Sequence, residues 1–121
     1  MSIKTFFANN CETRELHREP ELRTNYYGNN FSQIVAALNE IASEMRLEVR
    51  NVDKTHREVY MLGQGYDVIF TLVEITPIEI GVDIKVNWFS ALGFNRPKKK
   101  VMEIYSKMKK KLRFKGVALH P

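Results

Sequence analysis

The sequence has a single cysteine, Cys11, so no disulfide can form within the chain. With no histidine near it in sequence, Cys11 is best interpreted as an inert thiol, and low cysteine usage is typical of the reducing cytoplasm. No apolar run approaches the roughly 20 residues of a membrane-spanning helix. Residues 1–10 contain one lysine and no long apolar stretch, unlike a signal peptide. We therefore expect a cytoplasmic protein without a transmembrane segment.

The sequence also lacks the motifs of the common enzyme classes, namely the nucleophile elbow, the phosphate loop and the dinucleotide fingerprint. His17, His56 and His120 lie in three separate segments, so none has a second ligand at metal-binding spacing. Glu74 and Asp83 would form a carboxylate pair only if they shared a face of the predicted sheet. Both alternate with apolar residues, as solvent-facing positions do. We predict no catalytic residue, no metal site and no cofactor, and expect that the protein is not an enzyme.

Length and composition indicate one globular domain. The chain has 121 residues, of which 44% are hydrophobic and 27% are charged. These values argue against a disordered chain, and a chain of this length can bury one sizeable core. We predict a loosely ordered arm over residues 1–19 with room for a short strand, a single domain over residues 20–115, and a tail over residues 116–121.

Two segments have the apolar spacing of amphipathic helices. Asn30 has the position of an N-cap with Gln33 as its capping-box partner, and helical spacing continues to Met45. Pro97 fits the first turn of a second helix, and Gly116 fits its C-terminal cap. The apolar stripe of this second helix comprises Val101, Ile104, Tyr105, Met108 and Leu112.

The remaining segments have the alternation of β-strands. The predicted strands cover residues 22–27, 47–52, 57–62, 66–75 and 79–88. Residues 66–75 are apolar on both faces, which is typical of a central strand. Residues 79–88 are apolar on one face only and place Asp83, Lys85 and Asn87 on the other.

The order β-α-β-β-β-β-α predicts an α+β fold. Strands joined by short turns pair antiparallel, and a helix with one apolar stripe needs one sheet face to cover. We expect a two-layer sandwich in which two helices pack on one face of an antiparallel sheet of about five strands. The opposite face would meet water or a partner.

The net charge of +5 is unevenly distributed, because residues 96–115 contain ten lysines and arginines and one acid, Glu103. Residues 98–100 are three lysines in the first helical turn, where partial positive charge disfavours them and free N–H groups bind anions. The predicted anion- or polyanion-binding residues are Arg96, Lys98, Lys99, Lys100, Lys107, Lys110 and Lys111. The alternative is a solvated lysine face that pairs with Glu40 and Glu44 of the other helix.

Large apolar side chains, Trp88, Phe89 and Phe94, precede these lysines. Such residues beside lysines stack on single-stranded bases, enter anionic membrane surfaces or form the centre of a protein interface. The commoner arrangement is that the connection folds back and caps the core. The sequence leaves these roles open.

Three functions follow from these patterns. The first is a non-catalytic binding module that contacts nucleic acid or another polyanion through the lysine-rich C-terminal helix. The second is a protein-interaction or self-assembling module, with another protein or a second copy bound at the sheet face or edge. The third is a binder of small apolar ligands, with residues 88–94 as a lid.

Overall fold

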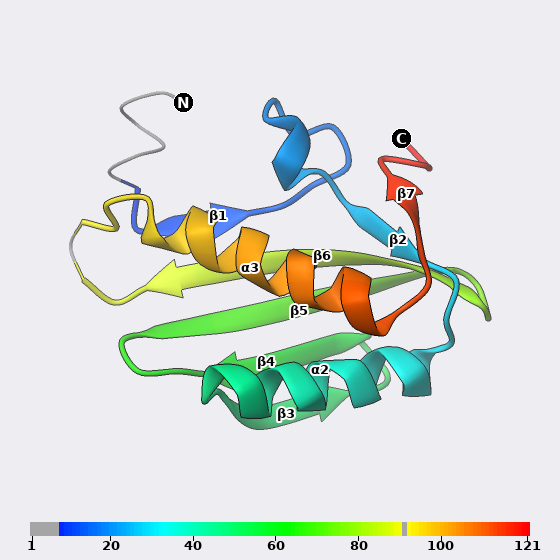
Figure 1. The fold of residues 1–121 in the computed structure, drawn as a ribbon, viewed down its shortest axis with the longest axis horizontal. Helices are drawn as coiled ribbons and strands as arrows, with labels where there is room; N and C mark the ends of the chain where they lie inside the picture. Colours follow the sequence, from blue (N-terminus) through cyan, green and yellow to red (C-terminus); the bar gives the residue numbers. More distant parts are fainter. Residues whose placement is uncertain (1–7, 91) are drawn as a thin grey trace.

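The computed structural model of the chain describes residues 8–90 and 92–121. Both α-helices lie on one side of a single twisted sheet (Figure 1). This confirms the predicted α+β fold, although the sheet has seven strands rather than about five. In chain order the elements are β1 (Asn10–Glu12), the 3₁₀ helix η1 (Pro20–Leu22), β2 (Asn25–Tyr27), α2 (Phe31–Met45), β3 (Glu48–Asp53), β4 (Glu58–Leu62), β5 (Tyr66–Thr76), β6 (Glu79–Trp88), α3 (Arg96–Lys111) and β7 (Phe114–Val117).

The sheet is antiparallel, with strand order β3-β4-β5-β6-β2-β7. β5 lies between β4 and β6, so the prediction that it is central is confirmed. β1 and β2 both pair with β6, β1 along residues 85–87 and β2 along residues 80–82. The sheet is therefore interrupted between β1 and β2, and the loop over residues 13–24 leaves and re-enters it there.

The core lies between the sheet and the two helices. In β6 every second side chain faces the helices and is fully buried, namely Ile80, Val82, Ile84 and Val86. Asp83, Lys85 and Asn87 alternate with them on the opposite face, as predicted. Burial of each large aliphatic side chain stabilises the fold by about 1.5–3 kcal/mol, so this alternation fixes which face the helices cover.

α2 begins with the predicted capping box. The Asn30 side chain accepts a hydrogen bond from the Gln33 N–H at 2.8 Å, and the Gln33 side chain accepts one from the Asn30 N–H at 3.0 Å. Within the described residues no helix is long and apolar enough to cross a membrane.

α3 ends at Lys111, before the position that the sequence indicates. Gly116 does not cap this helix, because it lies within β7, which pairs with β2. Its φ of 154° suits glycine, and a Cβ atom there would lie 2.9 Å from the Leu119 side chain. The run of lysines before Leu112 continues the helical pattern, so the boundary has no marker in the sequence.

Candidate functional site

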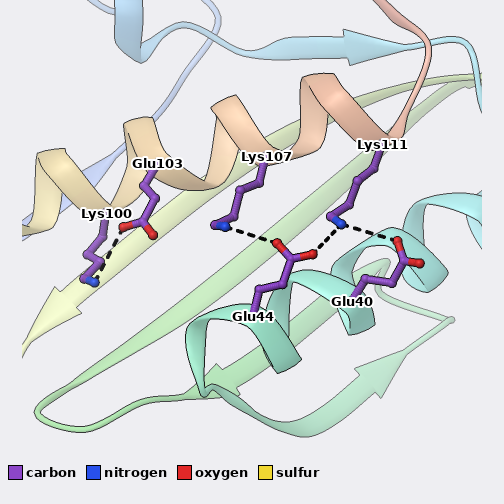
Figure 2. Close-up of polar contacts among 6 residues, drawn as sticks. All are labelled: Glu40, Glu44, Lys100, Glu103, Lys107 and Lys111. Atoms are coloured by element: carbon purple, nitrogen blue, oxygen red, sulfur yellow. Dashed lines mark hydrogen bonds and ion pairs between the residues drawn. The ribbon is translucent and has the colours of Figure 1, made fainter.

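Two of the predicted polyanion-binding lysines instead join the helices to each other. Lys107 Nζ lies 3.1 Å from a carboxylate oxygen of Glu44, and Lys111 pairs with the other oxygen (Figure 2). Lys111 also lies 3.6 Å from Glu40. Hydrogen bonds from Lys111 and Lys107 lower the pKa of Glu44. The alternative of an α3 lysine face paired with α2 acids therefore holds for these two lysines.

Lys98, in the first turn of α3, pairs with carboxylates of the N-terminal part of the chain. Its Nζ lies 2.6 Å from Glu19 and 2.9 Å from Glu21, and its side chain is only 11% exposed. The hydrogen bond to Glu19 is the main cause of a raised Lys98 pKa. The protein's own carboxylates thus bind the lysine that was expected to bind an external anion.

The seven predicted cations therefore divide into two groups. Four form ion pairs inside the protein, namely Lys98, Lys100, Lys107 and Lys111, with Lys100 Nζ 3.6 Å from Glu103. The other three, Arg96, Lys99 and Lys110, are exposed and form no ion pair in the described part of the chain. These three remain available to an external anion.

The connection between β6 and α3 does not bury its phenylalanines. Phe89 is 59% exposed and Phe94 is 44% exposed. Trp88 is half-buried, packs against the core, and stacks on Tyr66 with ring centroids 5.1 Å apart and planes 11° apart. Core capping is therefore the wrong interpretation for the phenylalanines and describes only Trp88.

Cations lie over these aromatic rings. The Arg96 guanidinium is 5.7 Å from the ring centroid of Trp88 and 5.7 Å from that of Phe94. Lys100 Nζ lies 5.4 Å from the centroid of Tyr66, the ring stacked on Trp88. Each such contact contributes about 0.5–1 kcal/mol at an exposed position. We call the set Tyr66, Trp88, Phe89, Phe94, Arg96 and Lys99 the aromatic-basic end.

The aromatic-basic end contains strained backbone. Phe94 and Asn95 both have left-handed conformations, with φ of 51° and 65°, which cost roughly 1–3 kcal/mol each for such residues. A Cβ atom on Gly93 would lie 2.1 Å from the Ala8 carbonyl oxygen, so glycine is required there. The Arg96 N–H donates to the Gly93 carbonyl at 3.0 Å. Nothing in the sequence except Gly93 marks this geometry.

The weaker chemical candidates from the sequence do not form sites. Glu74 is opposite Ile80 in the β5–β6 ladder and Asp83 is opposite Thr71, so the two carboxylates are on different faces of the sheet. Glu74 instead pairs with Arg57 at 2.7 Å. Among residues 8–90 and 92–121, no group of three potential metal-ligating side chains comes together.

Cys11 lies in the core and is 8% exposed. Burial raises the pKa of its thiol to about 11. The thiol is therefore protonated at neutral pH and is a poor nucleophile, as expected of an inert cysteine.

No protein-family model matches the chain, and a search of curated proteins gives no match.

Proposed function

We propose that this protein is a non-catalytic cytoplasmic module that binds single-stranded nucleic acid through its aromatic-basic end. The observation that carries this proposal is the position of Arg96 over both Trp88 and Phe94, next to exposed Phe89. Aromatic side chains stack on unpaired bases, and neighbouring cations contact the phosphates between them. Arg96 and Lys99 form no internal ion pair in the described residues, so a ligand phosphate need not displace a carboxylate.

The chemistry favours a single strand over a duplex. Stacking contributes about 1–3 kcal/mol per base and requires a base outside a helix. Sequence-specific duplex readers usually place arginines against base edges in the major groove. Here the one arginine of the end lies over aromatic rings. We therefore expect binding with little dependence on base sequence.

Fluorescence anisotropy with a labelled oligonucleotide tests the proposal. Wild-type protein should bind the single strand more tightly than the duplex, with a log–log salt slope of about −1.4 if Arg96 and Lys99 contact phosphates. The double variant R96Q/K99Q should reduce affinity at least tenfold. The matched control K107Q/K111Q removes the same charge from lysines already paired with acids, so its affinity should stay near that of wild type.

Other results would contradict this assignment. Equal losses in the two double variants would show that net charge alone governs binding. Equal affinity for heparin and the oligonucleotide, with no loss in F89A, would exclude base stacking and indicate a general polyanion binder. Absence of binding at low salt would refute the proposal.

A second candidate function is contact with a protein partner through the β5–β6 hairpin. Val73, Ile75 and Ile78 are 42%, 37% and 69% exposed there. β4 pairs only with residues 67–71 of β5, so the distal half of β5 extends beyond it. Self-association would appear as a mass above monomer by light scattering that is insensitive to salt and lost in I78D. A monomer at all concentrations would exclude a second copy as that partner.

A further inference from the structure

A pocket of about 340 Å³ lies where the N-terminal loop folds back beside β1. β1 lies beside the first turns of α3 (Figure 1), and Glu19, just before η1, pairs with Lys98 in the first of these turns. The lining of the pocket includes Asn10, Cys11, Arg14, His17, Arg18 and Leu22. None of these residues belongs to the aromatic-basic end, so the pocket can be tested independently of the function proposed above.

Backbone hydrogen bonds shape the pocket in the free protein. The Thr13 N–H donates to the Ile84 carbonyl at 2.9 Å, which fixes the start of the loop to β6. The Arg14 N–H donates to the Leu22 carbonyl at 3.2 Å, and the His17 N–H donates to the Arg14 carbonyl at 3.2 Å. Because both ends of the loop are held, little ordering is needed when a ligand enters.

The lining of the pocket combines two buried apolar residues with two exposed arginines. Leu22 is 1% exposed and Cys11 is 8% exposed. Arg14 and Arg18 are exposed and form no ion pair in the described residues. The two carboxylates of the lining differ, because Glu19 is paired with Lys98 whereas Glu12 has no ion-pair partner in the described part of the chain.

His17 adds a neutral donor to this lining. Its Nδ1 accepts a hydrogen bond from the Glu19 N–H at 3.0 Å, so the proton of the neutral ring is on Nε2. Burial, with the charge of Arg14 second, lowers the pKa of His17 below its usual value. At neutral pH the imidazole is therefore an N–H donor rather than a cation.

We infer that this pocket binds the phosphate monoester of a nucleotide. Two guanidinium groups match the oxygens of a phosphate in bidentate geometry, and the His17 N–H supplies a further donor. The backbone N–H of Trp88 donates to the Asn9 carbonyl at 2.6 Å. This hydrogen bond connects the segment beside the pocket to the aromatic-basic end. The ligand is either a free mononucleotide or the 5′-terminal nucleotide of a nucleic-acid strand.

Isothermal titration with adenosine 5′-monophosphate and with adenosine tests the inference. The monophosphate should bind at least tenfold more tightly than the nucleoside. R14Q/R18Q should remove this difference, whereas R50Q, which removes an exposed arginine on β3, should not. E12Q should tighten binding, because it removes the unpaired carboxylate, and a gain of affinity cannot result from misfolding. Equal affinity for the two compounds, or an unchanged affinity in R14Q/R18Q, would overturn the inference.

A second comparison separates the two sources of the phosphate and the two proposals. If the pocket holds a strand end, a 5′-phosphorylated oligonucleotide should bind more tightly than its 5′-hydroxyl form, and R14Q/R18Q should equalise them. If it holds a free nucleotide, adenosine monophosphate should bind while the two oligonucleotides bind equally. In R96Q/K99Q the monophosphate should still bind even though oligonucleotide affinity falls. Loss of monophosphate binding in R96Q/K99Q would refute a separate pocket.

Discussion

The ammonium of Lys98 lies 2.6 Å from the carboxylate of Glu19, a residue 79 positions earlier in the chain. Both side chains are largely shielded from water, with 11% and 19% of their surfaces exposed. The ion pair connects the N-terminal loop to the first turn of α3. Lys98 therefore supports the fold, whereas its neighbours Arg96 and Lys99 face solvent.

Replacement of Lys98 should therefore reduce stability rather than nucleic-acid affinity. We expect K98Q to lower the free energy of unfolding by about 1 kcal/mol, the upper end for surface ion pairs, because its side chain is shielded and contacts two acids. K99Q removes an adjacent exposed charge and should leave stability unchanged. Urea unfolding of both variants measures the difference, and equal stability of the two would contradict it.

The ion pairs between α2 and α3 should make stability depend on salt. Lys107 and Lys111 both pair with exposed Glu44 (Figure 2), and salt screens such pairs. We expect E44Q to melt at a lower temperature than wild type in dilute buffer, and the difference to shrink in 0.5–1 M salt. A difference that is independent of salt would show that Glu44 acts by packing instead.

Asp83 should make a pH-dependent contribution to stability. Burial raises the pKa of Asp83 in the folded state, against the hydrogen bonds donated by Thr24 and Thr13 at 2.6 and 2.8 Å. The pKa of Asp83 in the folded state is above its unfolded value of about 3.9. The stability that protonated Asp83 contributes is therefore fully present below about pH 3.9 and is lost as the pH rises through the folded pKa. D83N should therefore gain stability relative to wild type between about pH 4 and 7.

The matched variant D83A separates charge from hydrogen bonding. Alanine leaves the buried hydroxyls of Thr13 and Thr24 without this acceptor, so D83A should be about 1–3 kcal/mol less stable than D83N at pH 7. Urea unfolding of the three proteins at several pH values provides the test. Equal stability of D83A and D83N would show that the hydrogen bonds from Thr13 and Thr24 do not contribute to stability.

Replacement of Gly81 should reduce stability, because an aromatic ring covers it. A Cβ atom at Gly81 would lie 2.6 Å from the Tyr26 ring, whose hydroxyl donates to Glu15 at 2.6 Å. G81A must displace this ring, and we expect a loss of about 1–3 kcal/mol. Gly65 has open space around its Cβ position but a φ of 85°, so G65A should cost only backbone strain. Thermal unfolding of both variants measures the difference. A smaller loss of stability in G81A than in G65A would contradict the prediction and show that the Tyr26 ring moves freely.

Local patterns predicted the parts of this fold that depend on neighbouring residues. The capping box of Asn30 and Gln33 and the alternation of β6 both follow from side-chain chemistry within a few positions. β7 could not be predicted, because only two residues separate it from the lysines of α3 and its four residues derive their structure from pairing with β2. Strands this short depend on tertiary contacts more than on propensity.

The candidate site was only half predictable for the same reason. Glu40 and Glu44 are one helical turn apart, as are Lys107 and Lys111, so their pairing had a sequence signal. The pairing of Lys98 with Glu19 had none, since it depends on the path of the loop before η1. The exposure of Phe89 likewise follows from the direction in which the chain leaves β6.

The fluorescence of Trp88, the single tryptophan of the chain, reports directly on the aromatic-basic end. Titration with single-stranded oligothymidylate should quench this emission, the quenching should reverse as salt is added, and R96Q/K99Q should need at least tenfold more ligand. A matched duplex should quench less at the same concentration. Unchanged Trp88 emission at saturating oligonucleotide, or equal quenching in wild type and R96Q/K99Q, would contradict the assignment of this end as a nucleic-acid-binding surface.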